Sequence, residues 1–308
     1  SIYRILKKYG FGREELGGKL FCPSRKELNL ENYNEVNNWF KLNNPSIVIL
    51  AAAEVGGIHA NNSRPADFIL KNLKIQTNLI ELSFIHNVKR FLFLGSSCIY
   101  PKFAKQPIQE ESLLSSSLEE TNQWYAIAKI AGLKLCQSLR IQHNFDTISL
   151  MPTNLYGEND NYHPKDSHVL PAMIRKFWLA KKSNISRVSC WGTGKPLREF
   201  LFVDDLAEAC LFTLNNLNPT QDKFNNQEIN WLNVGSDFEI SIKELALKIS
   251  NIMKYEGEII WDESKPDGTY RKKLDTTKIN NLGWEAKTDL DTGIAKVVES
   301  LKTKNSFF

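Results

Sequence analysis

The chain has 308 residues, of which 42% are hydrophobic and 24% are charged, as is ordinary for a folded globular protein. Its net charge of +4 is not gathered into basic runs, so we expect no nucleic-acid partner, whereas an anionic small molecule would suit it. The five cysteines lack a C-x-x-C pair, which predicts no disulfide framework, no metal site and a cytoplasmic location. The longest apolar run, residues 47–53, is too short to cross a membrane.

The first residues predict a helix, because Ile2, Ile5 and Leu6 fall on one face and two lysines follow. The glycines of residues 10–18 come after this helix, so they cannot form the phosphate-binding turn between a first strand and a helix. That first strand is the central one in a doubly wound dinucleotide-binding sheet. We therefore expect that the natural protein is longer, with a strand and a glycine-rich loop upstream of this chain.

Three short apolar runs predict buried parallel strands at residues 46–53, 90–96 and 147–153. Each run is rich in branched or aromatic residues and ends in small or turn-forming ones. Helical periodicity lies between the runs, around residues 68–84 and after Trp124. This alternation of strand and helix predicts an α/β protein with a doubly wound, Rossmann-like parallel sheet.

The second half predicts a smaller α/β domain laid over the carboxyl ends of the strands, where ligands bind in open α/β sheets. Ser241 and Glu244 have the spacing of a capping box, and Thr288 is the expected cap of the last helix. By residue, the expected domains are 1–157 with 199–236 for a dinucleotide cofactor, and 158–198 with 237–308 for the substrate.

Two residues on the helix after Trp124 have the spacing of a catalytic pair. Tyr125 and Lys129 are four residues apart, so they project from the same face. A phenol with a pKa near ~10 is a poor acid or base at neutral pH, and a nearby ammonium lowers that pKa. Ser96 or Ser97 could add a hydrogen bond to a substrate oxygen. The alternative is a half-buried tyrosine beside a lysine that reaches solvent.

These residues resemble the serine–tyrosine–lysine triad of the extended short-chain dehydrogenase/reductase superfamily. Residues 198–209 and 274–284 are similar to that superfamily's later signatures. Longer motifs, which together cover nearly everything from Ser24 onward, resemble the GDP-L-fucose synthase family; they are residues 51–62, 94–102, 151–164, 167–177 and 264–275. The resemblance implies an NADPH-dependent enzyme that epimerises GDP-4-keto-6-deoxy-D-mannose at C3 and C5 and then reduces its C4 ketone to give GDP-L-fucose.

The resemblance also implies a set of site residues. The implied catalytic residues are Ser96, Tyr125, Lys129, Cys98 and His168. The implied cofactor-binding residues are Leu94, Gly95, Ser96, Ser97, Lys129, Pro152, Thr153, Asn154, Leu155 and His168. The implied substrate-binding residues are Lys176, Trp191, Arg198 and Asp267. No glycine of the family's phosphate-binding loop can be carried over to this chain.

Two further interpretations come from chemistry. Arg25 follows the expected second strand, where a cation suits the 2′-phosphate of NADPH, although it could also be a solvated arginine in a turn. Inversion of C3 and C5 needs an acid/base pair beyond the reductase triad. Cys98 and His168 are the candidates, since thiols and imidazoles titrate close to neutral pH. The alternatives are a packed cysteine and a surface histidine.

Several rival functions stay open. Another NDP-sugar epimerase or dehydratase of the same superfamily is the nearest, although the neighbours Ser97 and Cys98 offer no acidic residue for a dehydratase. A non-catalytic dinucleotide-binding relative is the second rival. Superfamily members commonly form dimers through a helix pair that includes the Tyr125 helix, so the resemblance implies a homodimer. Guanosine specificity rests on the resemblance alone.

Overall fold

The computed structural model describes residues 1–308 apart from 165, 220–222, 225–226, 230, 266 and 304–308. The main helices are α1 (Ile2–Lys8), α2 (Tyr33–Asn43), α3 (Ile58–Ser63), α4 (Pro65–Ile85), α5 (Gln123–His143), α6 (Val169–Lys182), α7 (Val203–Asn216), α8 (Ile242–Met253), α9 (Thr277–Asn281) and α10 (Leu290–Thr303). The strands are β1 (Ile47–Leu50), β2 (Arg90–Leu94), β3 (Thr147–Pro152), β4 (Asn154–Tyr156), β5 (Arg187–Trp191), β6 (Leu197–Phe202), β7 (Lys223–Phe224), β8 (Gln227–Glu228), β9 (Leu232–Val234), β10 (Glu239–Ser241), β11 (Glu258–Asp262) and β12 (Arg271–Lys272).

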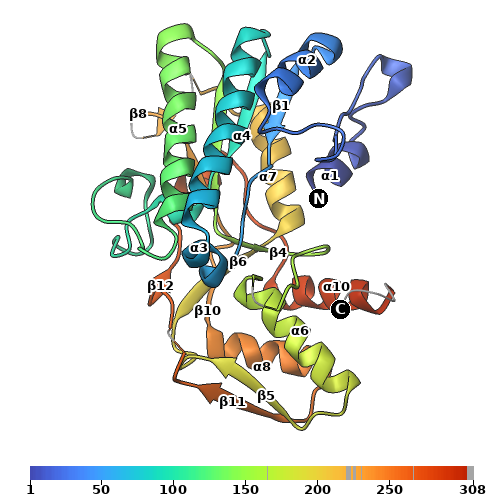
Figure 1. The fold of residues 1–308 in the computed structure, drawn as a ribbon, viewed down its shortest axis with the longest axis vertical. Coiled ribbons are helices and arrows are strands. Elements are labelled where there is room, and N and C mark those ends of the chain that lie inside the picture. Colours follow the sequence, from blue (N-terminus) through green and yellow to red (C-terminus); the bar gives the residue numbers. More distant parts are fainter. Residues whose placement is uncertain (165, 220–222, 225–226, 230, 266, 304–308) are drawn as a thin grey trace.

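A parallel sheet with the strand order β1-β2-β3-β9 forms the upper part of the molecule in Figure 1. The three predicted strands are confirmed as its neighbouring members β1, β2 and β3. Both faces of the sheet are covered, which is why these strands read as continuous apolar runs. Phe91 and Phe93 of β2 pack on the side of α4 and α5, whereas Leu92 and Leu94 pack with α7.

The predicted amino-terminal helix is confirmed as α1. Its Ile5 and Leu6 pack against Ala207 and Leu211 of α7. Among the described strands, β1 pairs with β2 alone, so its other edge carries no strand in this part of the chain. The glycine-bearing turn after α1 leads into a 3₁₀ helix (Glu14–Leu16), which agrees with the prediction that these glycines do not follow a strand.

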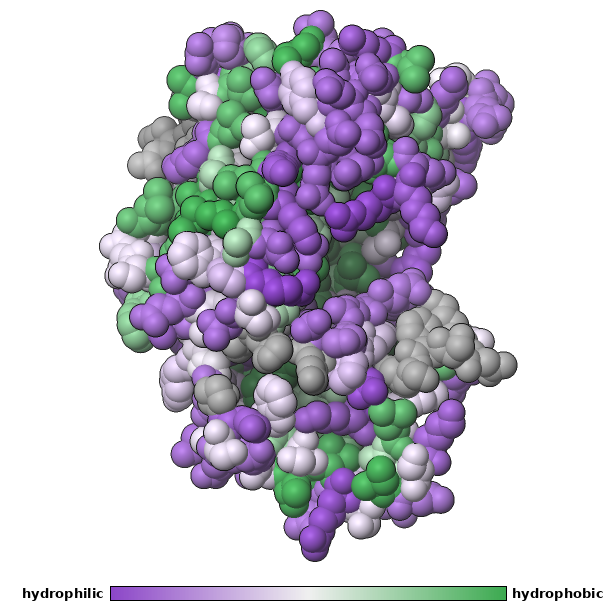
Figure 2. Space-filling view, viewed as in Figure 1, coloured by the Kyte–Doolittle hydropathy of each residue, from purple (hydrophilic) through white to green (hydrophobic). Residues whose placement is uncertain are grey.

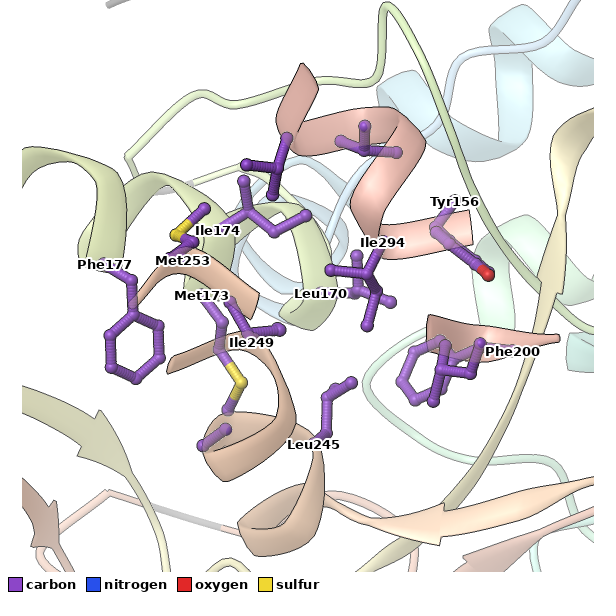
Figure 3. Packing of buried hydrophobic residues seen from close by; sticks show 14 of the residues in the cluster. Tyr156, Leu170, Met173, Ile174, Phe177, Phe200, Leu245, Ile249, Met253 and Ile294 are labelled. Carbon is purple, nitrogen blue, oxygen red and sulfur yellow. The ribbon is translucent and has the colours of Figure 1, made fainter. Parts of the chain in front are cut away.

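The lower part has a hydrophobic core of its own. Figure 3 shows α6, α8 and α10 meeting around Leu170, Ile174, Leu245, Ile249 and Ile294. Strands β5 and β11 pair in parallel at its edge. The upper and lower parts thus have separate cores, and the surface between them is hollowed, with apolar residues at the floor of the hollow (Figure 2).

Of the two helix caps predicted in this part, one is confirmed and one is wrong. Ser241 and Glu244 form the expected capping box at the start of α8. The cap of α10 is Asp289 rather than Thr288, because the Asp289 carboxylate accepts the Thr292 amide at 2.8 Å. Thr288 instead bonds to Asp205 through both its amide and its hydroxyl. A carboxylate one residue closer to the helix therefore takes the capping position.

One buried carboxylate joins the two parts. Glu199 of β6 is fully buried, and its Oε1 accepts the amides of Ser236 at 2.8 Å and Asp237 at 3.0 Å. Its Oε2 accepts the amide of Leu274 at 3.0 Å. Its main-chain oxygen accepts the Asn154 side-chain amide at 2.8 Å. Glu199 therefore holds the turn after β9, the segment after β12 and the start of β4 against β6.

We expect Glu199→Gln to lower the free energy of unfolding by about 2–3 kcal/mol, because an amide NH₂ would face backbone N–H donors in place of a carboxylate oxygen. Urea denaturation of the variant and the parent measures this difference. Glu256→Gln is the control, since Glu256 is exposed. Equal stability of the Glu199 variant and the parent would contradict the role assigned to this carboxylate.

Candidate active site

The predicted triad comes together where β2 ends. Ser96 follows this strand and caps a 3₁₀ helix (Ser97–Ile99) by accepting the amide of Cys98 at 3.2 Å. Ser96 also hydrogen-bonds to Tyr125, near the start of α5. One turn further along α5, Lys129 is buried and donates from Nζ to the main-chain oxygen of Leu94 at 2.8 Å.

The charges of this triad differ from the expectation. Burial, with a smaller contribution from the negative charge of Cys98, raises the pKa of Tyr125 above its usual value. Burial also lowers the pKa of Lys129 to about 8. Lys129 was expected to lower the pKa of Tyr125, but its Nζ lies 5.8 Å from the tyrosine ring centroid and desolvation dominates at both groups. In this structure Tyr125 is therefore a neutral phenol, suited to donate a proton.

Cys98 lies beside the triad, half-buried, in the 3₁₀ helix after β2. Its sulfur accepts hydrogen bonds from Asn122 Nδ2 at 3.4 Å and from Lys272 Nζ at 3.5 Å. A small polar cavity adjoins it, lined by residues that include Lys102, Glu119 and Lys272. The thiol is thus at a polar site rather than packed in the hydrophobic core.

His168 stands at the position before the first residue of α6, and its side chain caps no helix amide. The residue as a whole is exposed. Desolvation by the surrounding protein, and then the positive charge of Lys272, lower its pKa. Lys272 thus contacts the sulfur of Cys98, and its positive charge also acts on His168.

The carboxyl ends of β2 and β3 border the triad. Pro152 ends β3 and Asn154 begins β4, as expected for a strand end at the ligand edge. The main chain is close-packed here, because a Cβ on Gly95 would lie 2.2 Å from Met151 Sδ. The amide of Thr153 donates to Val234 at 3.0 Å, which ties this edge to β9. Leu94, Ser97 and Leu155 lie at the same strand ends.

The four predicted substrate residues gather on the lower part. Lys176 of α6 lies 5.5 Å from the ring centroid of Trp191, which is 56% exposed at the end of β5. Arg198 of β6 has its pKa lowered by burial, partly offset by the charges of Asp267 and Glu119. Asp267 accepts the amide and the hydroxyl of Thr193.

The contacts of two neighbouring carboxylates and of Arg25 are also defined. The Glu199 carboxylate accepts backbone amides and Asp204 pairs with Arg4 at 2.6 Å, so neither carboxylate forms an ion pair with Arg198. Arg25 lies on an exposed turn, where its guanidinium pairs with Glu31 at 2.7 Å. Its role in cofactor preference stays a prediction.

Two residues beside Cys98 were not predicted from the sequence, Asn122 and Lys272. Lys272 lies in a run with Arg271 and Lys273, and the order of residues alone does not tell which cation points into the site. In the described ranges no cluster of histidine, cysteine or acidic residues could hold a metal ion. No described helix combines the length and apolar character that crossing a membrane requires.

Comparisons with known proteins identify the family of the chain. Residues 7–226 match the model of the NAD dependent epimerase/dehydratase family. "Putative GDP-L-fucose synthase 2" of Arabidopsis thaliana is 52% identical over 97% of this chain and 87% of its own length. "GDP-L-fucose synthase" of Escherichia coli K12 is 46% identical over 91% of this chain and 88% of its own length. The solved structure of MlghC, "GDP-mannoheptose C4 reductase from Campylobacter jejuni with NADP bound", has a TM-score of 0.87 and 38% identity over 98% of this chain and 93% of that one.

The fold and the sequence similarity are thus those of an epimerase or reductase that acts on a nucleotide-linked sugar. The chain belongs to the NAD dependent epimerase/dehydratase family of extended short-chain dehydrogenases/reductases, and within it to the group of GDP-L-fucose synthases.

The buried ammonium of Lys129 predicts a pH-dependent stability. Its pKa is about 8 in the folded chain and 10.5 in its ordinary state, so between these values only the unfolded chain holds the proton. The free energy of unfolding therefore rises as the pH is raised from about 8 to about 10.5. We expect Lys129→Met to be more stable than the parent at pH 7 by about 1–2 kcal/mol. This difference is the cost of burying the ammonium minus the contribution of the hydrogen bond that the variant loses.

Urea denaturation at pH 7 and at pH 10.5 measures this effect, and the advantage of the variant should shrink at the higher pH. Lys74→Met on α4 serves as the control, because Lys74 is exposed. A Lys129→Met variant that is destabilised equally at both values of pH would contradict the prediction.

Proposed function

We propose that the protein is a GDP-L-fucose synthase, which epimerises GDP-4-keto-6-deoxy-D-mannose at C3 and C5 and reduces the C4 ketone with NADPH. The observation that carries this proposal is the convergence of two chemical sets. The Ser96–Tyr125–Lys129 group adjoins Cys98. The ammonium of Lys272 lies beside the Cys98 sulfur, and its charge also lowers the pKa of His168. A reductase needs only the first set, whereas inversion of two carbons needs the second as well.

Epimerisation uses the acidity of the carbons beside the ketone. When a proton leaves C3 or C5, the electron pair of the C–H bond moves onto the ketone oxygen as an enolate. Cys98 and His168 exchange protons with opposite faces of the sugar, so that one removes a proton and the other delivers one. Ser96 and the neutral phenol of Tyr125 stabilise the enolate oxygen by hydrogen bonding.

Reduction uses the same oxygen. Tyr125 donates its proton to the C4 oxygen as the carbonyl becomes an alkoxide, and Ser96 holds that oxygen through a second hydrogen bond. Lys129 lies one helical turn from Tyr125 and stabilises the phenolate that results. NADPH, when bound, supplies the hydride to C4.

The residues at the sheet edge fit the nicotinamide end of such a cofactor. Lys129 has a buried ammonium aimed at the end of β2, and Asn154 and Thr153 sit at the neighbouring strand end. Close packing at Gly95 leaves no room for a side chain there. Leu94, Ser97, Pro152, Leu155 and His168 complete the set that we propose around this end of the cofactor.

We propose that Arg25 selects NADPH over NADH. Glu31 accepts from one guanidinium nitrogen, and the exposed remainder of Arg25 can reach a 2′-phosphate. We expect Arg25→Glu in the full-length protein to raise the KM for NADPH at least about tenfold, because a like charge would face the phosphate. Initial rates with NADPH and NADH measure the preference, and an unchanged ratio would contradict the assignment. Lys26→Glu is the control at an exposed neighbour.

We propose that the upper part holds the dinucleotide and the lower part the GDP end of the substrate. Lys176, Arg198 and the exposed ring of Trp191 offer two cations and a stacking surface for a diphosphate and a base. Asp267 lies in the same cluster and orders its loop through Thr193. The chemistry of these four side chains favours an anionic nucleotide sugar.

We also propose that the protein is a cytoplasmic homodimer. The five free cysteines suit a reducing compartment. Helices α4 and α5 pack side by side and carry the outward-facing apolar residues Leu70, Trp124 and Ile127. Figure 2 shows apolar surface on the side where these helices lie. A monomeric mass in sedimentation of the full-length protein would contradict the dimer.

Three rival functions are less well supported by these observations. A reductase without epimerase activity has no use for a polar thiol held by two donors. A dehydratase needs an acidic residue beside the catalytic hydroxyl, and the neighbours here are Ser97 and Cys98. A non-catalytic scaffold needs neither set.

The decisive assay gives the full-length protein the 4-keto sugar with NADPH and follows absorbance at 340 nm and the product. We expect consumption of NADPH and formation of GDP-L-fucose. With NADP⁺ in D₂O, deuterium should enter C3 and C5, and Cys98→Ser should slow this exchange by about 10²-fold or more, while hydride transfer to the ketone stays measurable.

His168→Asn should behave in the same way, and Cys22→Ser, at an exposed cysteine, should match the parent. Undiminished deuterium exchange at C3 and C5 in a Cys98→Ala/His168→Ala double variant would contradict the assignment of these two residues. Consumption of NADPH without any exchange at C3 or C5 would favour a simple C4 reductase.

A further inference from the structure

The surroundings of Cys98 contain a residue that the proposed mechanism does not use. Lys272 Nζ lies 3.5 Å from the Cys98 sulfur, and Asn122 Nδ2 lies 3.4 Å from it. A cysteine that only fills space would have apolar neighbours. Here an ammonium and an amide both direct N–H donors at the sulfur, and a thiolate is the form of cysteine that accepts such bonds well.

Strand geometry explains why this lysine reaches the site. β12 pairs in parallel with β6, with Lys272 opposite Arg198. Successive side chains of a strand point to opposite faces. Arg271 is therefore directed to Glu239, where its Nε donates to the carboxylate at 2.8 Å, and Lys272 is directed to Cys98.

A side-chain amide fixes the main chain on both sides of Lys272. Gln106 Nε2 donates to the main-chain oxygen of Arg271 at 3.1 Å, and its Oε1 accepts the amide of Lys273 at 2.9 Å. The amide of Ile108 then donates to the oxygen of Lys273 at 2.8 Å. The segment that follows Cys98 in the sequence thus holds the strand that carries the lysine.

The other charged groups near Cys98 are engaged elsewhere. In the cavity beside the thiol, Lys102 pairs with Glu119 at 3.1 Å, and Arg271 pairs with Glu239. Tyr125 faces Cys98 from α5 as a neutral phenol. His168, at the start of α6, feels the charge of Lys272 as well. Among these described groups, Lys272 is the cation in contact with the sulfur.

We propose that Lys272 is a positioning residue for epimerisation, whose ammonium, together with the Asn122 amide, holds Cys98 as the thiolate that accepts a proton from the sugar. The C–H bond breaks, its electron pair moves to the C4 oxygen, and the proton forms the S–H bond. Lys272 keeps its own protons throughout. The catalytic part of this inference rests on the proposed function, whereas the effect on the sulfur does not.

The first experiment needs no sugar. In a Cys22→Ser background the three other cysteines are buried, so iodoacetamide reports on Cys98. We expect Lys272→Met to slow alkylation at pH 7 by about tenfold, because an opposite charge at this distance favours the thiolate. Lys272→Arg should retain most of the rate, and Lys102→Met should match the parent. Thermal melting checks that each variant is folded.

A second variant tests the placement of the lysine. Gln106→Ala leaves the ammonium in the chain but removes the clamp on its strand, so we expect a smaller loss of alkylation rate than in Lys272→Met. An alkylation rate that is unchanged in a folded Lys272→Met protein would overturn the proposal, whatever Gln106→Ala does.

The catalytic part is tested in the full-length enzyme by deuterium exchange at C3 and C5. Lys272→Met should lower kcat for exchange by about tenfold or more, with little change in KM, and should move the pH optimum upward. A raised KM with an unchanged kcat would make Lys272 a simple substrate contact and overturn its positioning role. Slowed alkylation in Lys272→Met, together with no exchange in the parent, would support the contact with the sulfur and defeat the proposed function.

Discussion

The buried carboxylate of Glu199 is the interaction on which the arrangement of the site depends. A charged group without exposure to water is stable only when hydrogen bonds replace its hydration, and three backbone amides do so here. Those amides belong to two segments that are far apart in the sequence. The bonds fix the segments against β6, and thereby place the strand of Lys272 level with Arg198.

The packing of Gly235 shows how tightly this junction is built. A Cβ at that glycine would lie 2.3 Å from Glu199 Oε1, so the turn after β9 can approach the carboxylate only without a side chain. Thr153 and Asn154, at the end of β3, bond to the main-chain oxygen of the same residue. The edge of the sheet and the lower part of the molecule therefore share one hydrogen-bonded centre.

The electrostatics of the site follow from burial more than from ion pairing. Desolvation raises the pKa of Tyr125 and lowers those of Lys129 and His168, so Tyr125 stays a neutral phenol and Lys129 holds a buried ammonium that loses its proton near pH 8. The cation of Lys272 lies next to the Cys98 sulfur instead of a carboxylate. Such a site favours negative charge on the sulfur and on a developing enolate oxygen, as epimerisation beside a ketone requires.

Local order in the sequence was enough to predict the sheet strands, the helix of Tyr125 and Lys129, and the capping box of α8, because each depends on residues a few positions apart. The family motifs supplied Cys98 and His168. Only the tertiary structure revealed Asn122 and Lys272 at the sulfur, the raised pKa of Tyr125 and the role of Glu199. These depend on which distant segments pack together and how much water they exclude, and neither quantity is encoded in the spacing of residues along the chain.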